Sequence, residues 1–164
     1  PERYRLRARH LQRCRMHADW RDAAGDDPAA DPVAAAGLGI GRRALREAID
    51  DAKRTRAAAA WEETVQALLA DAATELDAAM LLTWKAAVAE YPSLAAASMA
   101  KLASTGAVQR AVERATQVVG ADSFQRGHVI ERLAQDVRAL ELFAGRTEAL
   151  REAVAEEELP EVAG

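Results

Sequence analysis

The sequence predicts an all-α protein, an up-and-down bundle of four or five helices. Half of the 164 residues are apolar but only 4% are aromatic, and half of the apolar residues are alanine. Side chains this small favour helices that approach one another closely. Apolar residues recur at helical spacing in successive segments that end at Pro, at Gly or at a break in the pattern. A chain of this length can bury a core of its own as one domain.

The first helix is predicted from Asp31, an N-cap, to about Arg56, with Pro32 at the first helical position. Its apolar stripe runs mostly at four-residue spacing through Val33, Ala36, Ile40, Ala44, Ala48 and Ala52. Three glycines lie in the same segment, Gly37, Gly39 and Gly41. Each glycine costs about 1 kcal/mol of helix propensity relative to alanine. We expect close backbone contact with another helix to compensate for that cost.

The second predicted helix has the clearest periodicity in the chain and ends before Tyr91-Pro92, because proline disfavours helical backbone in the preceding residue. Its stripe consists of Trp61, Val65, Leu68, Ala72, Leu76, Met80, Thr83 and Ala87. We expect the larger members, Trp61, Leu68, Leu76 and Met80, to leave an apolar face that another domain or a second chain would cover.

Ser93 is the predicted N-cap of a third helix, which runs to Val119 and stops at Gly120. The apolar positions between these ends include Met99, Leu102, Val108 and Val112. A helix of this length crosses the whole bundle.

A fourth helix is predicted from about Val129 to Phe143, with His128 at its start. Ala144 and Gly145 then interrupt the helical pattern. We expect Thr147 to cap a short fifth helix after this break.

Charge divides the chain into a basic arm and an acidic body. Residues 1–21 hold seven arginines against Glu2 and Asp19, a sum of +5, while the whole chain carries −4, so the remainder carries about −9. The segment from Asp22 to Pro32 is rich in turn formers and reads D-A-A-G-D-D-P-A-A-D-P. We therefore predict an arm and linker over 1–31 and a helical bundle over 32–164.

The arm offers two other interpretations, neither of which we prefer. His10, Cys14 and His17 would share one face of a helix, but no fourth metal ligand is evident and the flanking arginines repel a cation, so no metal site is predicted. The arginines would suit nucleic acid, yet only Tyr4 and Trp20 supply aromatic rings between them. A solvated or partner-docking arm fits R-Y-R-L-R-A-R better, since this segment also alternates like an amphipathic strand.

Composition also bears on location. One cysteine excludes an internal disulfide framework, and no apolar run approaches the length of a membrane span. The first arginines are not followed by the apolar stretch of a signal peptide. The sequence thus predicts a cytoplasmic protein.

Four motifs then occur in register within about residues 32–155. They are A-S-M-A-K-L-A-S (97–104), A-T-Q-V-V-G-A-D-S-F (115–124), V-I-E-R-L-A-Q-D-V-R (129–138) and F-A-G-R-T-E (143–148). In order and spacing they resemble the C-terminal helical domain of acyl-CoA dehydrogenases, where the motifs read A-x-M-A-K, Q-x-x-G-G-x-G-Y, P-x-E-R-x-x-R-D and Y-E-G-T. G-R-R-A-L-R-E-A-I-D and L-A-D-A-A-T-E-L resemble the first two helices of that domain. No match to the family's other two domains is visible.

The resemblance implies an oxidoreductase reaction on acyl thioesters, in which a glutamate removes the α-proton while FAD accepts a hydride. The family holds this glutamate at one of two positions, which correspond here to Ala144 and to about Ala29. An alanine side chain cannot take a proton, so the sequence predicts a catalytically degenerate domain without a catalytic residue. The carboxylates that could replace the base are Glu141 and Glu148 near Ala144, and Asp27 and Asp31 near Ala29.

The resemblance implies flavin contacts as well, of which the sequence retains a part. The family's R-x-x-F-G is represented only by K-R-T-R-A-A-A-A, and Ala121 replaces a glycine, where a Cβ can block close approach to a cofactor. The cofactor-binding candidates are Arg54, Arg56, Gln117, Gly120, Ala121 and Gly145. Residues 117–121 equally fit an ordinary helix C-terminus and turn. We expect FAD binding by this chain to be weak or absent.

Three functions stay open at this point. The first is a degenerate acyl-CoA dehydrogenase-like domain that assembles with itself or with a catalytic flavoprotein, because the family directs these contacts to the flavin of a neighbouring subunit. The second is an FAD-dependent acyl-CoA dehydrogenase with a displaced base. The third is a module that binds nucleic acid or an acidic partner through the arm. The losses at Ala144, at Ala29 and in R-x-x-F-G favour the first.

Overall fold

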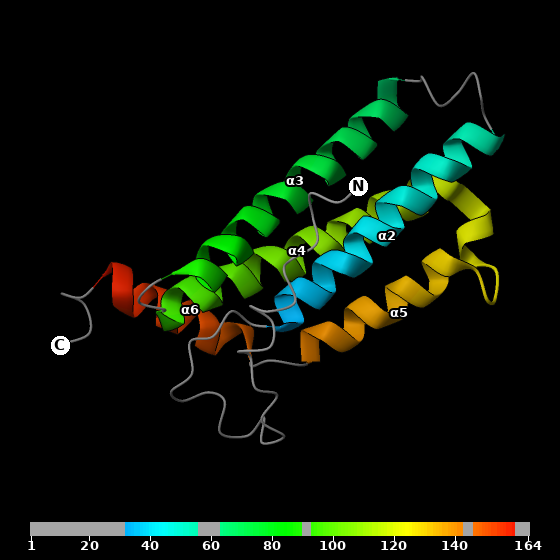
Figure 1. The fold of residues 1–164 in the computed structure, drawn as a ribbon. Coiled ribbons are helices and arrows are strands. Elements are labelled where there is room, and N and C mark those ends of the chain that lie inside the picture. The colour runs from blue at the N-terminus through cyan, green and yellow to red at the C-terminus, as the bar shows by residue number, and fades with distance from the viewer. Residues whose placement is uncertain (1–31, 56–62, 90–92, 143–145, 160–164) are drawn as a thin grey trace.

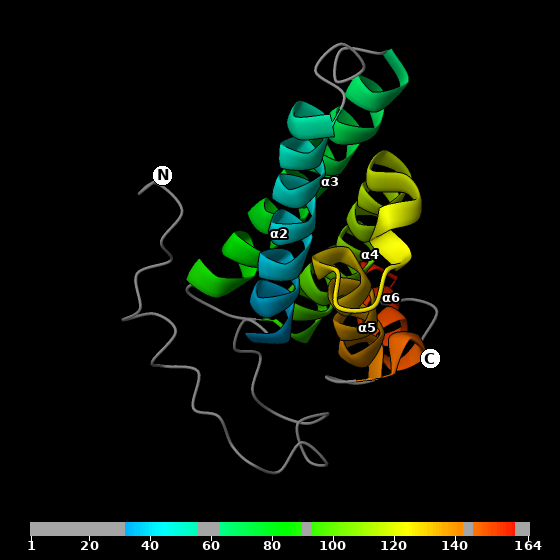
Figure 2. The same ribbon diagram turned by 90° about the vertical axis from the view of Figure 1, so that its right-hand side faces the viewer.

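The computed structural model describes residues 32–55, 63–89, 93–142 and 146–159. The elements in these ranges are α2 (Pro32–Thr55), α3 (Glu63–Val88), α4 (Leu94–Val119), the 3-10 helix η3 (Gly120–Phe124), α5 (Val129–Leu142) and α6 (Thr147–Glu158). From α2 to α5 successive α-helices run in alternating directions (Figures 1 and 2), which confirms the predicted up-and-down bundle. Arg56, Trp61, Tyr91-Pro92 and Phe143 lie outside the described residues, as does the arm with its proposed boundary at residue 31.

Helix α4 forms the centre of the bundle and packs against α2, α3, α5, α6 and η3. Twelve of its 26 residues are buried, and seven of the twelve are alanine or serine. Small side chains on several faces of one helix let its neighbours approach closely. Small side chains are therefore concentrated on α4, the helix against which five other elements pack.

The glycines of α2 differ in their surroundings. A Cβ on Gly41 would lie 2.6 Å from Leu76 Cδ2 and 3.3 Å from Val108 Cγ2, and a Cβ on Gly37 would lie 3.3 Å from a leucine methyl of α5. Gly39 is exposed and has no such neighbour within 4 Å. The expected compensation by close packing is confirmed at Gly41 and Gly37 and is wrong at Gly39, which faces solvent.

The predicted stripe of α2 fails at one position, Ala36, whereas Ile40 packs, partly buried, against the core as predicted. Ala36 is exposed, and Ala34 and Leu38 are buried in its place. A strict four-residue spacing drifts around a helix that has 3.6 residues per turn. The buried alanines of the second half are Ala44, Ala48 and Ala52.

The predicted stripe of α3 faces the core, so the expectation that it forms an uncovered apolar face is wrong. Leu76 is buried, and Leu68 and Met80 pack, partly buried, against the same core. The stripe is covered because α3 lies along α4 and α2. The large apolar side chains that α3 exposes are on its other side, in its C-terminal half: Leu81 (70% exposed), Leu82 (37%), Trp84 (48%) and Val88 (54%).

Local chemistry explains most helix ends. The Ser93 hydroxyl accepts the backbone N–H three residues on at 3.0 Å, as predicted, and Gly120 ends α4 with φ of 75°. His128 Nδ1 accepts the N–H two residues on at 3.2 Å, which places it at the start of α5. The predicted cap at Thr147 is wrong. Arg146 is the N-cap residue there because it is the last with extended backbone, and its side chain makes no capping hydrogen bond.

A carboxylate clamps α3 onto α4. Glu75 accepts hydrogen bonds from Arg114 Nη2 at 2.8 Å and from Arg110 Nε at 2.6 Å. The hydrogen bond from Arg114, helped by Arg110, lowers the pKa of Glu75 to about 2 against the opposing effect of partial burial. The clamp joins residues that lie 35 and 39 positions apart in the chain.

Two glycine variants test the close packing. We expect Gly39→Ala to raise the free energy of unfolding by about 0.5–1 kcal/mol, because alanine is the better helix former and has free space here. Gly41→Ala should lower it by about 1–2 kcal/mol, because the new methyl overpacks against buried Leu76 and Val108. Urea denaturation followed by circular dichroism measures both values. Equal changes in the two variants would contradict the packing assigned to Gly41.

Glu75→Gln tests the clamp through its pH dependence. The pKa of Glu75 is lower in the folded state than its ordinary 4.5, so the clamp stabilises fully above that value and is lost as pH falls towards about 2. Because Glu75 is 31% exposed, we expect the variant to lose about 1 kcal/mol at neutral pH. The difference from the wild type should vanish near pH 2. Glu47→Gln, which removes only a pair within α2, should change stability by a few tenths of a kcal/mol.

Candidate functional site

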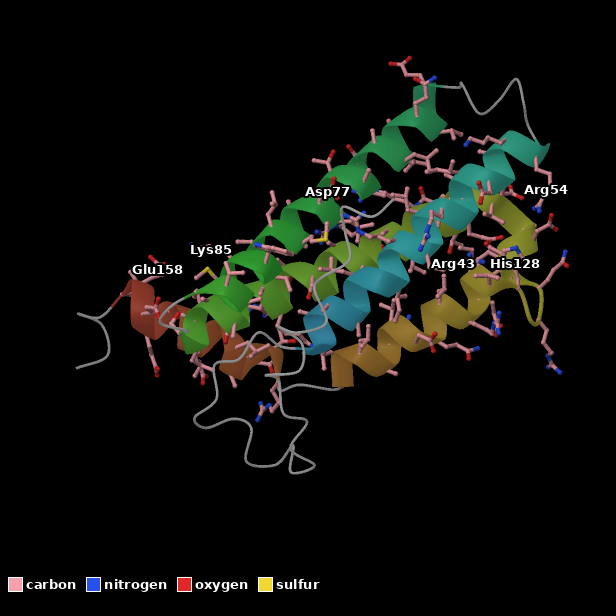
Figure 3. All side chains as sticks on the ribbon, in the orientation of Figure 1. Arg43, Arg54, Asp77, Lys85, His128 and Glu158 are labelled. Carbon is pink, nitrogen blue, oxygen red and sulfur yellow. The ribbon has the colours of Figure 1, made fainter. Side chains whose placement is uncertain are left out.

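The described flavin-contact candidates gather at one end of the bundle. Arg54 lies in the last turn of α2, Gln117 in the last turn of α4, and Gly120 and Ala121 in η3. α2 and α4 both run towards this end (Figure 1), and Figure 3 shows Arg54 there together with His128, which follows η3. The fold thus brings together residues that are more than 60 positions apart. Arg56 and Gly145 lie outside the described residues.

Arg54 is held in place by an acidic side chain that the sequence reasoning missed. Its Nη2 donates to Asp51 Oδ1 at 2.6 Å, and Asp51 is 8% exposed whereas Arg54 is 67% exposed. A guanidinium carries five N–H donors, so this contact leaves donors for an anion. The signal in the sequence is the i, i+3 spacing of the two residues, which ion pairs on helices share.

Gly120 has a local explanation that does not require a cofactor. Its φ of 75° and ψ of −143° suit glycine, and its N–H donates to the Thr116 carbonyl to close α4. This geometry fits the interpretation of residues 117–121 as a helix C-terminus. Apart from the adjacent backbone, no atom of the described residues lies within 4 Å of the position that a Cβ would take on Gly120, and Gln117 and Ala121 are exposed. The turn is therefore open to an approaching ligand.

An open groove of about 250 Å³ lies beside this turn, between η3 and the first turns of α5. Phe124, 76% exposed, stands at its edge, and Arg138 supplies a cation. The other lining residues are Thr116, Ser123, Ile130, Glu131, Ala134 and Gln135. Phe124 was missed as a site residue, although it lies seven positions after Gln117, where Q-x-x-G-G-x-G-Y has its aromatic ring.

The candidate base positions lie elsewhere. Ala144 is outside the described residues, as are Ala29, Asp27 and Asp31, and of Glu141 only the backbone in α5 is described. Glu148 is in the first turn of α6, and its exposed carboxylate is 3.8 Å from Arg146 Nε. None of the described residues shields this exposed carboxylate from water as a general base requires. Glu148 thus gives the displaced-base hypothesis little support.

Lys101 connects α4 to the end of α5, just before the break. It is 4% exposed, and its Nζ donates to the Leu140 carbonyl at 3.2 Å. The last four carbonyls of a helix have no N–H partner within the helix, and a cation there also opposes the negative end of the helix dipole. The lysine of A-S-M-A-K thereby satisfies one of the last carbonyls of α5. The sequence motif was noted, but this role of its lysine was missed.

The break and the flavin-contact turn are far apart within one chain. Lys101, which contacts the end of α5, lies in the N-terminal third of α4, and Gly120 directly follows the last residue of α4. The nineteen positions that separate them correspond to about 28 Å at 1.5 Å per residue. The two ends of α4 lie at opposite ends of the bundle (Figure 1).

The part of the chain that the structure describes contains neither a metal-ligand cluster nor a membrane-spanning helix. No group of three His, Cys, Asp or Glu side chains among them is arranged to hold a metal ion. None of the described helices has the length and the apolar character that a membrane span requires. His10, Cys14 and His17 belong to the arm, outside this part of the chain, and the cytoplasmic location stays a prediction.

Comparisons with known proteins agree on one family. The family model for "Acyl-CoA dehydrogenase, C-terminal domain" matches residues 32–159. The chain is 36% identical over 128 residues to 3-sulfinopropanoyl-CoA desulfinase of Paraburkholderia xenovorans and 35% identical over 129 residues to bovine mitochondrial short-chain specific acyl-CoA dehydrogenase. Each match covers 75% of this chain but only 33% and 31% of the relative. The chain thus spans about a third of the length of these relatives.

Solved structures give the same result. The glutaryl-coenzyme A dehydrogenase complex with glutaryl-CoA superposes with a TM-score of 0.73 at 25% identity, over 78% of this chain and 34% of that one. A structure of nitroalkane oxidase superposes with a TM-score of 0.70 at 27% identity, over 79% and 33%. Both matches cover a similar third of a longer chain.

Lys101→Met tests the link between α4 and the break. The variant leaves the Leu140 carbonyl without this donor, so we expect a loss of about 1–2 kcal/mol in the free energy of unfolding. Amide hydrogen exchange should accelerate in the last turn of α5 and in α6 and change little in α2. Lys85→Met is the matched control on exposed surface and should stay within about 0.5 kcal/mol of the wild type. An equal effect of both variants would rule out the assigned role.

Proposed function

Because the chain belongs to the acyl-CoA dehydrogenase C-terminal domain family, we propose that it is a catalytically degenerate helical domain that acts in assembly. Its partner is a second copy or a catalytic flavoprotein of the same family. The observation that carries this proposal is the separation of the break from the flavin-contact turn along α4. A domain with these two features at opposite ends contributes to two sites, and each site needs a second chain.

The loss of the catalytic base supports the proposal that this domain is catalytically degenerate. The family reaction removes a proton from a weak carbon acid and needs a carboxylate beside it, whereas this chain has Ala144 at the matched position. The carboxylate nearby that the structure describes, Glu148, is exposed and beside Arg146. The displaced-base alternative requires a carboxylate such as Glu148 to move to the position that Ala144 occupies in the motif.

We also propose that this chain binds FAD weakly or not at all. The features that could still contact FAD are the accessible guanidinium of Arg54, the open turn at Gly120 and the groove edged by Phe124. When bound, FAD would accept the hydride in the family reaction, and these residues would hold its phosphates and adenine end. The missing aromatic-glycine turn of R-x-x-F-G and the Cβ of Ala121 oppose tight binding.

Solvent deuterium exchange at the α-carbon of an acyl-CoA tests the catalytic part. We expect no exchange by the wild type when FAD and the other domains of a catalytic relative are supplied, because loss of a general base costs on the order of 10² to 10⁴ in rate. Ala144→Glu combined with Arg146→Thr should restore exchange, since the second change removes a guanidinium that would lower the new carboxylate's pKa.

The visible spectrum of the purified chain serves as the parallel readout, because bound oxidised flavin absorbs. Robust exchange by the wild type would show that the base lies elsewhere. FAD that co-purifies at one per chain would overturn the cofactor part separately.

Sedimentation equilibrium tests the assembly part. We expect the chain to form dimers, or a complex with a catalytic relative, through the end that carries η3. Phe124→Ser should weaken this association, because Phe124 is exposed there and its loss leaves the described core intact. Leu81→Ser, an equally exposed apolar position on α3, should not. A monomer under all conditions, or equal weakening by both variants, would refute this part.

A further inference from the structure

His128 joins η3 to α5 through a series of short-range hydrogen bonds. Its Nδ1 accepts the Ile130 N–H at 3.2 Å, its backbone N–H donates to the Gln125 carbonyl at 3.0 Å, and its carbonyl accepts the Arg132 N–H at 3.3 Å. Gln125 in turn donates its backbone N–H to the Asp122 carbonyl of η3 at 3.1 Å. The end of η3 and the start of α5 are therefore connected through this one histidine.

The cap that His128 places on α5 depends on the protonation state of its ring. The N–H of Ile130 is one of the first four of the helix, which have no carbonyl partner within it. Nδ1 accepts this N–H only while it carries no proton itself, so the capping form is the neutral ring with its proton on Nε2. Ile130 is 1% exposed, so water reaches its N–H only when the turn opens.

A protonated ring at this position would oppose the start of α5 in two ways. Its Nδ1–H would face the N–H of Ile130, and its positive charge would lie at the positive end of the helix dipole. The family motif P-x-E-R has proline at the first position of this helix, where proline favours helical backbone, but this chain has Val129 there. The start of α5 therefore relies on the cap from His128.

No described carboxylate forms an ion pair with His128 that would compensate for its charge. The charged groups on the elements around this turn are Asp122 of η3, Arg126 of the turn, Glu131 and Arg132 of α5, Arg43, Glu47, Asp51 and Arg54 of α2, and Glu113 and Arg114 of α4. Every carboxylate in this set accepts a hydrogen bond from an arginine or a glutamine side chain. These acids are thus already engaged.

We propose that His128 is a proton-sensitive cap, which holds the η3 end of the bundle in place and releases it as the pH falls. A histidine side chain ordinarily changes its charge between about pH 5 and pH 8. The cap is complete above this range, where the ring is neutral, and is lost as the pH falls through it. The groove edged by Phe124 lies between η3 and the first turns of α5, so it is built on the junction that the cap holds.

The consequence for assembly rests on the proposed function. The association proposed above uses the end that carries η3, where His128 also lies (Figure 3). Because Phe124 is held by η3 and the groove beside it by α5, a loosened junction would disperse the surface that a second chain contacts. We therefore expect association through this end to weaken in mild acid.

Amide hydrogen exchange of Ile130 tests the cap directly. His10→Gln and His17→Gln in every sample leave His128 as the only histidine of the full chain, and its ring ¹⁵N shifts report its protonation. Between about pH 7.5 and pH 5.5, we expect the protection factor of Ile130 to fall about fivefold, because removal of an N-cap has an effect of this order. The internal control is Ala96, whose N–H is capped by the non-titrating hydroxyl of Ser93, and its protection factor should stay constant.

Two variants separate the cap from a general effect of pH. His128→Asn keeps a capping oxygen that does not titrate in this range, so the protection of Ile130 should be high at both pH values. His128→Ala should lower it at both. An equal fall at Ile130 and Ala96, or a pH dependence that persists in His128→Asn, would overturn the proposal.

Sedimentation equilibrium at the same two pH values tests the consequence for assembly. The apparent dissociation constant should rise several-fold at the lower pH and stay unchanged in His128→Asn, because it varies inversely with the fraction of chains in the capped form. Loss of Ile130 protection without any change in association would refute the link to assembly. A chain that is monomeric at both pH values would refute the proposed assembly itself, whereas the exchange data would decide the cap independently.

Discussion

The contact of Gly41 with Leu76 and Val108 sets the spacing on which the rest of the bundle depends. A Cβ at this point would lie 2.6 Å from Leu76 Cδ2 and 3.3 Å from Val108 Cγ2, so either these buried side chains or α2 itself would have to shift. Because α4 packs against every other described helix, a shift there would pass to α5 and α6, and with them to the ends where the candidate residues lie. Small residues thus determine where the charged and aromatic ones stand.

Much of the fold could be predicted from the sequence because helix ends are encoded locally. Ser93, Gly120 and His128 act on backbone groups only a few residues away, so a linear pattern suffices to find them. Faces were harder. The stripe of α3 was assigned to a face that another domain or a second chain would cover, because periodicity reports that one side is apolar but cannot say what packs on it. The same limit applies to Gly39, which a pattern cannot distinguish from Gly41.

The candidate site shows a similar division. Motif order pointed to Gln117, Gly120 and the break near residue 144, whereas Lys101 and Asp51 emerged only with the coordinates. The partner of Lys101 is a backbone carbonyl 39 residues away, and Asp51, which holds the exposed Arg54, is itself only 8% exposed. A backbone partner has no residue type, so no sequence pattern announces it. Phe124 was available to sequence reasoning in principle, since it stands at an aromatic position of the family motif.

The length of α4 has a consequence for mixed assemblies under the proposed function. A pair of chains related by two-fold symmetry would build two sites, each from the break of one chain and the flavin-contact end of the other. If this chain paired with an active relative, the two sites would be unlike. One would combine the relative's base with the turn at Gly120, and the other would contain Ala144. Only one of the two sites in such a pair would contain a catalytic base. The activity of that site would show how well the η3 end of this chain supports a reaction whose base comes from the partner.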